Sequence, residues 1–159
     1  STFIYKDIDG KYKMCIWDFN SACDNYQDTY LKPSSLQFQY NVWYEMLMKD
    51  EDFNQRIIDR YHALRKTYLS EEYLDQYIDD TVSYLGDAVA RNFEKWGYTL
   101  DEDHALLTPV ERNLHSHQEA VIALKSNLSE RGRWMDQNIH TLRQYSAESK
   151  VKKFNEHTD

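Results

Sequence analysis

The chain has 159 residues, of which 19 are basic and 27 acidic, and its formal net charge is −8. That length suits a single domain of residues 1–159 with a hydrophobic core, and the acidic balance argues against a general nucleic-acid-binding protein. No apolar run approaches the roughly 18 residues of a membrane-spanning helix. Because the chain opens on strand residues without a leader sequence, we expect it to be a fragment of a longer protein.

The first predicted element is a β-hairpin over residues 1–20. Apolar residues alternate with polar ones on both sides of the sequence Asp-Ile-Asp-Gly, which is typical of a turn. Because an isolated hairpin is only marginally stable in water, we expect it to pack on the helices that follow. The alternating apolar residues are Phe3, Tyr5, Tyr12, Met14 and Ile16.

Asp18 stands just after the second strand, between two aromatic residues, and a polar loop over residues 21–35 is predicted to follow it. Two interpretations are open. A carboxylate at a strand end commonly accepts backbone N–H bonds in a turn, and it can also hold a metal ion at the edge of a cleft. A calcium loop that begins at Asp7 is excluded, because Gly10 falls at its fourth position rather than its sixth.

Residues 36–147 are predicted to be helical. The first helix follows a cap at Ser34 or Ser35, and the second begins at Asp50 or Asp52. Both helices carry an apolar face. These faces consist of Leu36, Tyr40, Trp43 and Leu47 in the first helix, and of Phe53, Ile57, Tyr61, Leu64 and Tyr68 in the second.

A third helix is predicted to run from a cap at Ser70 to Gly97, which ends it. Gly86 would lie in its interior, where glycine costs about 1 kcal/mol relative to alanine and where a neighbouring helix can approach closely.

The last predicted helix is long. The sequence Thr108-Pro109-Val110-Glu111 forms a capping box with proline at the first helical position, so the helix should begin at Pro109, and a bend is expected at Gly132. Residues 148–159 are expected to form a frayed tail. The residues that the helix should bury are Val110, Leu114, Val121, Leu124 and Leu128.

Several patterns of catalytic or metal-binding residues are missing from the sequence. His115 and His117 are two residues apart, so their side chains diverge on a helix and cannot share a zinc ion. No glycine-rich phosphate loop, Ser-His-Asp set or CxxC pair occurs. Cys15 and Cys23 lie on either side of Asp18, and the sequence leaves open whether they form a disulfide.

Five segments keep a fixed order and spacing along the chain: FIYKDIDGKYKMCIWDFN, WYEMLMKDEDF, RYHALRKTYLS, ARNFEKW and LKSNLSERGRWMD. In this order they resemble the C-terminal part of the CotH family, the spore-coat-protein-H-type atypical protein kinases. The similarity extends from Ser1 to about Tyr145. The predicted fold is therefore mainly α, with an N-terminal β-hairpin packed on a bundle of about four helices, and it resembles the C-terminal lobe of a divergent kinase-like fold.

The resemblance implies an ATP-dependent phosphotransferase that acts on Ser or Thr of surface or coat proteins. Asp18 would hold the Mg²⁺ or Mn²⁺ ion that bridges the ATP phosphates, with Asn20 as a further ligand. The nucleotide-binding lobe and the catalytic aspartate of the family would precede Ser1. No catalytic residue is therefore expected within this chain, and the chain alone is expected to be inactive.

The resemblance also implies an extracytoplasmic, cell-surface or spore-associated location and a Ser-rich surface or coat protein as substrate. Matching positions that we interpret as structural are Arg60, Arg65, Arg91 and Trp96.

An alternative is a non-catalytic helical module that binds a protein or glycan partner. Two departures from the family pattern favour it. Relatives often carry aspartate at the position of Asn20, and an aromatic-glycine pair where Cys23 and Asp24 stand. A strand-rich lobe with a lysine and a catalytic aspartate before Ser1 would favour the enzyme, whereas an unrelated module there would favour the binding protein.

Overall fold

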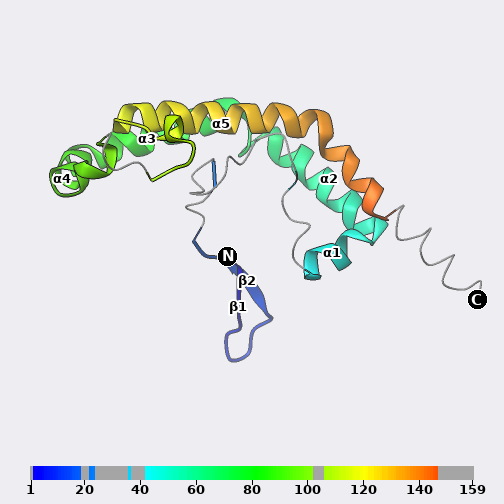
Figure 1. Cartoon of the computed structure of the whole chain (residues 1–159). Coiled ribbons are helices and arrows are strands. Elements are labelled where there is room, and N and C mark those ends of the chain that lie inside the picture. Colours follow the sequence, from blue (N-terminus) through cyan, green and yellow to red (C-terminus); the bar gives the residue numbers. More distant parts are fainter. Residues whose placement is uncertain (1, 19–21, 24–35, 37–41, 102–105, 147–159) are drawn as a thin grey trace, which may run out of the picture.

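The computed structural model describes residues 2–18, 22–23, 36, 42–101 and 106–146 (Figure 1). In these parts the chain is mainly helical with an N-terminal two-stranded antiparallel hairpin, so the predicted fold class is confirmed. The strands are β1 (Thr2–Tyr5) and β2 (Lys13–Ile16); the α-helices are α1 (Val42–Met48), α2 (Glu51–Arg65), α3 (Glu71–Leu85), α4 (Asp87–Trp96) and α5 (His117–Asn138); the short 3-10 helices are η2 (Gly97–Leu100), η4 (Val110–Arg112) and η5 (Ile139–Leu142).

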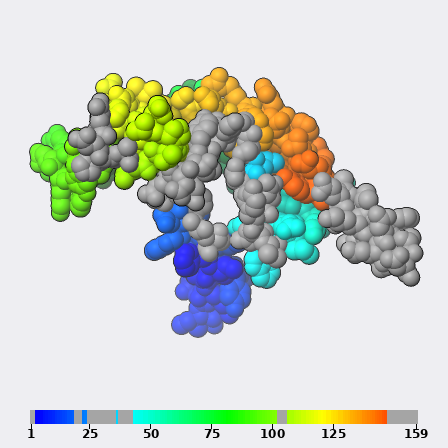
Figure 2. Space-filling view, viewed as in Figure 1, coloured from blue at the N-terminus to red at the C-terminus, as the bar shows by residue number. Residues whose placement is uncertain are grey.

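The hairpin turns where the sequence predicts, since the amide of Gly10 donates to the carbonyl of Asp7 at 3.0 Å. Its register pairs Phe3 with Cys15 and Ile4 with Met14. Residues that face each other across an antiparallel pair share one face of the sheet, so each face of the hairpin carries large apolar side chains. These side chains are exposed, and in Figure 2 the hairpin extends away from the helical layer.

Helix α5 is the longest element and organises the helical part. It runs beside α3 and then beside α2, while α4 and α1 lie at opposite ends of the layer (Figure 1). Polar side-chain contacts help to join α5 to α3. The Nζ of Lys125 lies 2.6 Å from the Asp79 carboxylate, and the hydroxyl of Ser129 donates to Glu71.

The hydrophobic core lies where the end of α5 and η5 meet α1 and α2. It consists of Met48, Ile58, Ile139 and Leu142, all nearly inaccessible to solvent. The amide of Asn54 is buried beside them and donates to the carbonyl of Met48 at 2.7 Å, which secures the C-terminal end of α1.

A polar clamp of Tyr61, Arg65 and Asp136 joins α2 to α5. The Nε of Arg65 lies 3.0 Å from both carboxylate oxygens of Asp136, and the hydroxyl of Tyr61 donates to the same carboxylate at 2.7 Å. Burial, together with this hydrogen bond and the charge of Asp136, raises the pKa of Tyr61 well above that of an ordinary tyrosine. Tyr61 therefore remains a hydrogen-bond donor.

Gly132 is part of the same contact. A methyl group at this position would lie only 2.7–2.9 Å from the guanidinium of Arg65. Helix α5 continues without interruption through this glycine, from His117 to Asn138, and the bend at Gly132 stays a prediction. Gly132 lets the arginine approach the helix backbone closely.

Two of the predicted helix starts are confirmed. The Asp50 carboxylate accepts from the amide of Phe53 at 2.7 Å, and the Ser70 hydroxyl accepts from the amide of Tyr73 at 3.2 Å. The predicted caps at Ser34 or Ser35 lie outside the described residues. So do most of the predicted loop 21–35 and the tail 148–159.

The predicted start of the last helix at Pro109 is wrong, because only the three-residue η4 follows that proline. The side chain of Asn113 binds the backbone of the preceding segment: it accepts from the amides of Leu106 and Leu107 and donates to the carbonyl of Val110. Side-chain bonds of this kind compete with helix formation. Val110, which was expected to be buried, is accordingly 57% exposed.

Helix α5 begins at a different capping box. The hydroxyl of Ser116 accepts from the amide of Glu119 at 3.1 Å, and the Glu119 carboxylate accepts from the amide of His115 at 2.8 Å. The pattern Ser-x-x-Glu is the same signal that predicted the start at Thr108.

The single predicted helix from Ser70 to Gly97 is also corrected. Gly86 has φ +46°, a value that side chains rarely tolerate, and it separates α3 from α4. Gly97 closes α4 in an ordinary right-handed conformation, and the chain continues into η2.

In α1 the predicted apolar face is shifted. Trp43 is 80% exposed, whereas Met48 enters the core.

A pair of substitutions tests the corrected start of α5. We expect Ser116→Ala to lower the free energy of unfolding by about 1 kcal/mol, because the amide of Glu119 loses its acceptor. Thr108→Ala is the control and should leave the stability unchanged, because no side chain caps η4. Chemical denaturation measures both. If only Thr108→Ala lowers the free energy of unfolding, the last helix begins at Pro109 after all.

A second pair tests the polar clamp. Asp136→Ala should destabilise the protein by about 1.5–3 kcal/mol, because the charged Arg65 and the hydroxyl of Tyr61 lose their acceptor. Asp79→Ala removes the more exposed pair with Lys125 and should cost at most about 1 kcal/mol. If Asp136→Ala and Asp79→Ala lower the denaturation midpoint by the same small amount, the clamp contributes no more to stability than the exposed ion pair.

Candidate functional site

Asp18 occupies the position that the sequence predicts, two residues after the end of β2. Its backbone has φ +57°, in the left-handed region. Aspartate and asparagine enter this region more readily than other side chains, but the conformation remains uncommon and costs energy. The carboxylate is exposed to solvent, so it is accessible to a ligand.

The aromatic neighbour of Asp18 holds the strand end in place. The ring of Trp17 packs edge-on against Phe3 of the paired strand, with ring centroids 5.3 Å apart. This contact crosses from the end of β2 to β1 and so limits the motion of the backbone that carries Asp18. Phe19 lies outside the described residues.

The donor chemistry at Asp18 fits magnesium or manganese. Mg²⁺ prefers oxygen ligands, keeps several waters, and binds through one or two carboxylates together with substrate phosphates. Within the described residues no group of three His, Cys, Asp or Glu side chains forms a complete metal site, so Asp18 would supply a single oxygen ligand there. Asn20 lies outside the described residues, as does the loop around Asp24.

The turn interpretation of Asp18 also remains open. Positive φ values occur both in turns and at functional sites, where strain is stored. In the described part of the chain no hydrogen bond between the Asp18 carboxylate and a backbone amide is observed, whereas Asp50 and Ser70 make such bonds as helix caps.

Both cysteines are exposed free thiols in the structure. Cys15 lies in β2 as predicted, but it is not buried. Cys23 has φ +55°, so two residues close to the end of the hairpin adopt left-handed backbone conformations.

The positions interpreted as structural divide into two kinds. Arg65 connects α2 to α5 as described above. Arg91 is exposed on α4, and Trp96 is 46% exposed with the Nζ of Lys95 5.0 Å from its ring. Arg60 lines a groove on α2.

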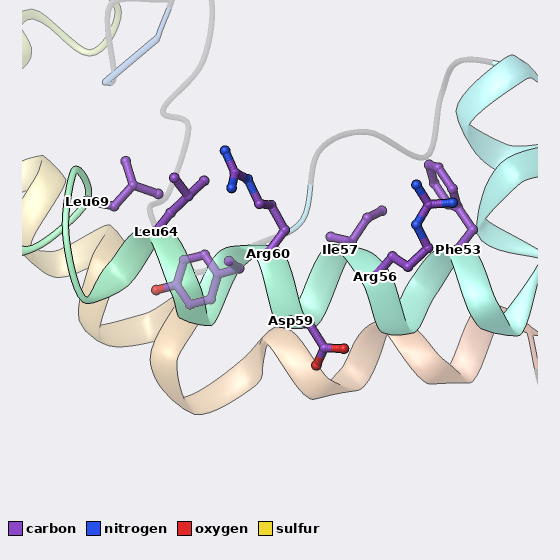
Figure 3. Close-up of a pocket in the computed structure, with 8 residues that line it drawn as sticks. Phe53, Arg56, Ile57, Asp59, Arg60, Leu64 and Leu69 are labelled. Carbon is purple, nitrogen blue, oxygen red and sulfur yellow. The ribbon is translucent and has the colours of Figure 1, made fainter.

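This arginine groove has a volume of about 740 Å³. Phe53, Ile57, Leu64 and Leu69 form its apolar part, and the side chains of Arg56 and Arg60 rise on the same side of the helix (Figure 3). Asp59 points away from them, and its carboxylate accepts from Gln55. The sequence interpretation missed Arg56, although its spacing of four residues from Arg60 places both side chains on one helix face.

In the described part of the chain, no helix is both long enough and apolar enough to cross a membrane.

A family model described as CotH kinase protein matches residues 1–135, which is most of the chain. No curated protein and no solved structure gives a significant match. The matched range includes the whole hairpin with Asp18, helices α1 to α4 and most of α5. Asp136 and the core residues Ile139 and Leu142 lie just beyond it.

Proposed function

The chain belongs to the CotH kinase protein family, and we propose that it is the helical C-terminal part of an atypical protein kinase in which Asp18 binds the metal ion of ATP. Family membership supports kinase-type phosphotransferase chemistry and favours it over a non-catalytic binding module. The observation that carries the assignment to Asp18 is its placement: an accessible carboxylate at the end of a strand, with a strained backbone and a neighbouring aromatic contact.

The proposed role of Asp18 follows from the charge that phosphoryl transfer develops. A divalent cation bridging the phosphates neutralises that charge, and an acidic side chain near the end of a strand is a recurring means of holding it. Asp18 would provide one anionic oxygen ligand, and Asn20 a neutral one. The carboxylate lies two residues beyond the end of the paired strand β2, which brings it to the edge of the hairpin.

The remaining parts of the catalytic apparatus are proposed to lie outside this chain. Phosphoryl transfer also requires a clamp for the phosphates and a residue that orients the attacking hydroxyl. We assign no residue of residues 1–159 to either role. The helical part would form the wall on the substrate side of the active site.

The substrate and the location are further parts of the proposal. Support for a Ser-rich surface or coat protein as substrate, and for an extracytoplasmic, cell-surface or spore-associated location, comes from the family resemblance alone.

Asp18→Asn in the complete protein tests the metal role. We expect phosphate transfer to be lost and the affinity for Mn²⁺ with ATP to fall, while the thermal unfolding temperature stays nearly unchanged, because the substitution removes one charged oxygen at an exposed position. Asp9→Asn in the hairpin turn makes the same charge change and should alter neither property. Lost stability with activity retained would identify Asp18 as a structural turn residue.

The chain of residues 1–159 by itself should show no kinase or ATPase activity above background. The reason is that positioning of the phosphates and of the hydroxyl provides most of the rate enhancement in phosphoryl transfer. The measurement is turnover of radiolabelled ATP in the presence of Mg²⁺ or Mn²⁺. Metal-dependent turnover that disappears in Asp18→Ala would show that the catalytic residues lie within this chain.

A further inference from the structure

Arg56 and Arg60 differ from the arginines that hold the helices together. Arg65 is paired with Asp136, and Arg143 donates to Gln55. By contrast, Arg56 and Arg60 form no hydrogen bond or ion pair with another described residue. Two guanidinium groups with no partner among the described residues therefore lie beside an apolar surface, on a chain whose net charge is −8.

The arginine groove is a second face of α2. At about 100° per residue, Phe53, Ile57 and Leu64 lie within roughly 40° of one another around the helix. The residues that face α5 lie roughly a quarter turn or more away from this group; they include Ile58 and Arg65. Among the described residues, the core and α5 pack on one face of α2, and Phe53 and Ile57 are half-buried where they border that core. The arginine groove lies beside this face.

Helix α3 presents an aromatic and acidic surface, in contrast to the basic groove on α2. This surface, the tyrosine face, consists of Tyr73, Tyr77, Tyr84 and Asp80. The three tyrosines are 42%, 61% and 90% exposed. The rings of Tyr73 and Tyr77 stack 6.3 Å apart. By helical geometry these residues lie opposite the side of α3 that bonds α5.

All charged residues of α3 are acidic. The helix contains five acidic residues and no lysine, arginine or histidine. Glu71 and Asp79 bond α5. At about 100° per residue, Asp75 lies on that same side of α3, Glu72 lies between the two sides, and Asp80 lies beside the tyrosines.

We propose that the arginine groove of one copy of this chain binds the tyrosine face of α3 of a second copy. Guanidinium groups pair with carboxylates and stack on aromatic rings, and an amphipathic helix in an apolar groove is a common mode of protein recognition. The spacing also matches: Arg56 and Arg60 are four residues apart, and so are Tyr73 and Tyr77. The two surfaces are different, so the contact is heterologous and each copy can accept one neighbour and offer itself to another.

Complementary charge is the reason for choosing a second copy as the occupant. The groove needs an acidic partner with apolar or aromatic side chains, and the chain itself exposes such a helix. This one contact would cover both the arginine groove and the tyrosine face.

The test uses the purified chain and two variants, each lacking one surface. The groove variant carries Arg56→Glu and Arg60→Glu, and the tyrosine-face variant carries Tyr77→Lys and Asp80→Lys. Sedimentation velocity should show that the wild-type mass grows with protein concentration and that added salt weakens this growth. Each variant alone should remain monomeric, since like charges across the contact weaken it by about 100-fold or more.

Mixing the two variants is the decisive measurement. The tyrosine-face variant retains its groove and the groove variant retains its α3, so an equimolar mixture should regain the self-association that each variant alone lacks. Arg91→Glu, on α4, is the matched control and should associate like the wild type. Circular dichroism checks that each variant is folded.

A wild-type chain that stays monomeric at all concentrations would overturn the proposal, and the groove would then have another occupant. A mixture of folded variants that stays monomeric would overturn it as well, because the observed self-association would then use other surfaces.

Discussion

The ion pair between Arg65 and Asp136 fixes how α2 and α5 meet. Its side chains come from positions 71 residues apart, and the guanidinium is only 16% exposed. A charged group taken largely out of water is stable only when it is paired and hydrogen-bonded, so the arrangement of α2 and α5 that supplies this partner is favoured over others. Gly132 favours the same arrangement, because a Cβ at this position would displace the guanidinium from its present place.

The hydrophobic core depends on the alignment that the clamp imposes. Asp136 is followed within two helical turns by Ile139 and Leu142, which pack against Met48 and Ile58. The core is small and lies at one end of α5, whereas the other half of α5 is held to α3 by polar contacts. Removing the clamp therefore affects the region where the side chains are most buried. Removing the polar contacts to α3 affects a region where water already competes for the same hydrogen-bonding groups.

Much of the fold could be predicted from local sequence signals. The turn at Asp7–Gly10 and the caps at Asp50 and Ser70 depend on residues within a few positions of one another, and such signals can be read from the chain. The start of α5 could not be decided in this way, because Thr108 and Ser116 both begin a capping box. The bonds from Asn113 to the preceding backbone decide between them. The clamp was beyond prediction, since nothing in the neighbourhood of Arg65 indicates a partner 71 residues away. The position of Asp18 at the end of a strand could be predicted from the alternating pattern, but its left-handed backbone could not.

Tyr61 connects the clamp to the surface of α2. Its hydroxyl is bound to Asp136, while its side chain also lines the arginine groove. A tyrosine held at its polar end has little freedom to rotate, so the wall of the groove that it forms has a fixed position. The raised pKa of Tyr61 means that this bond persists through the neutral and mildly alkaline range. It weakens only when the pH rises far enough to ionise the phenol. The contact that joins α2 to α5 thereby also shapes the arginine groove on α2.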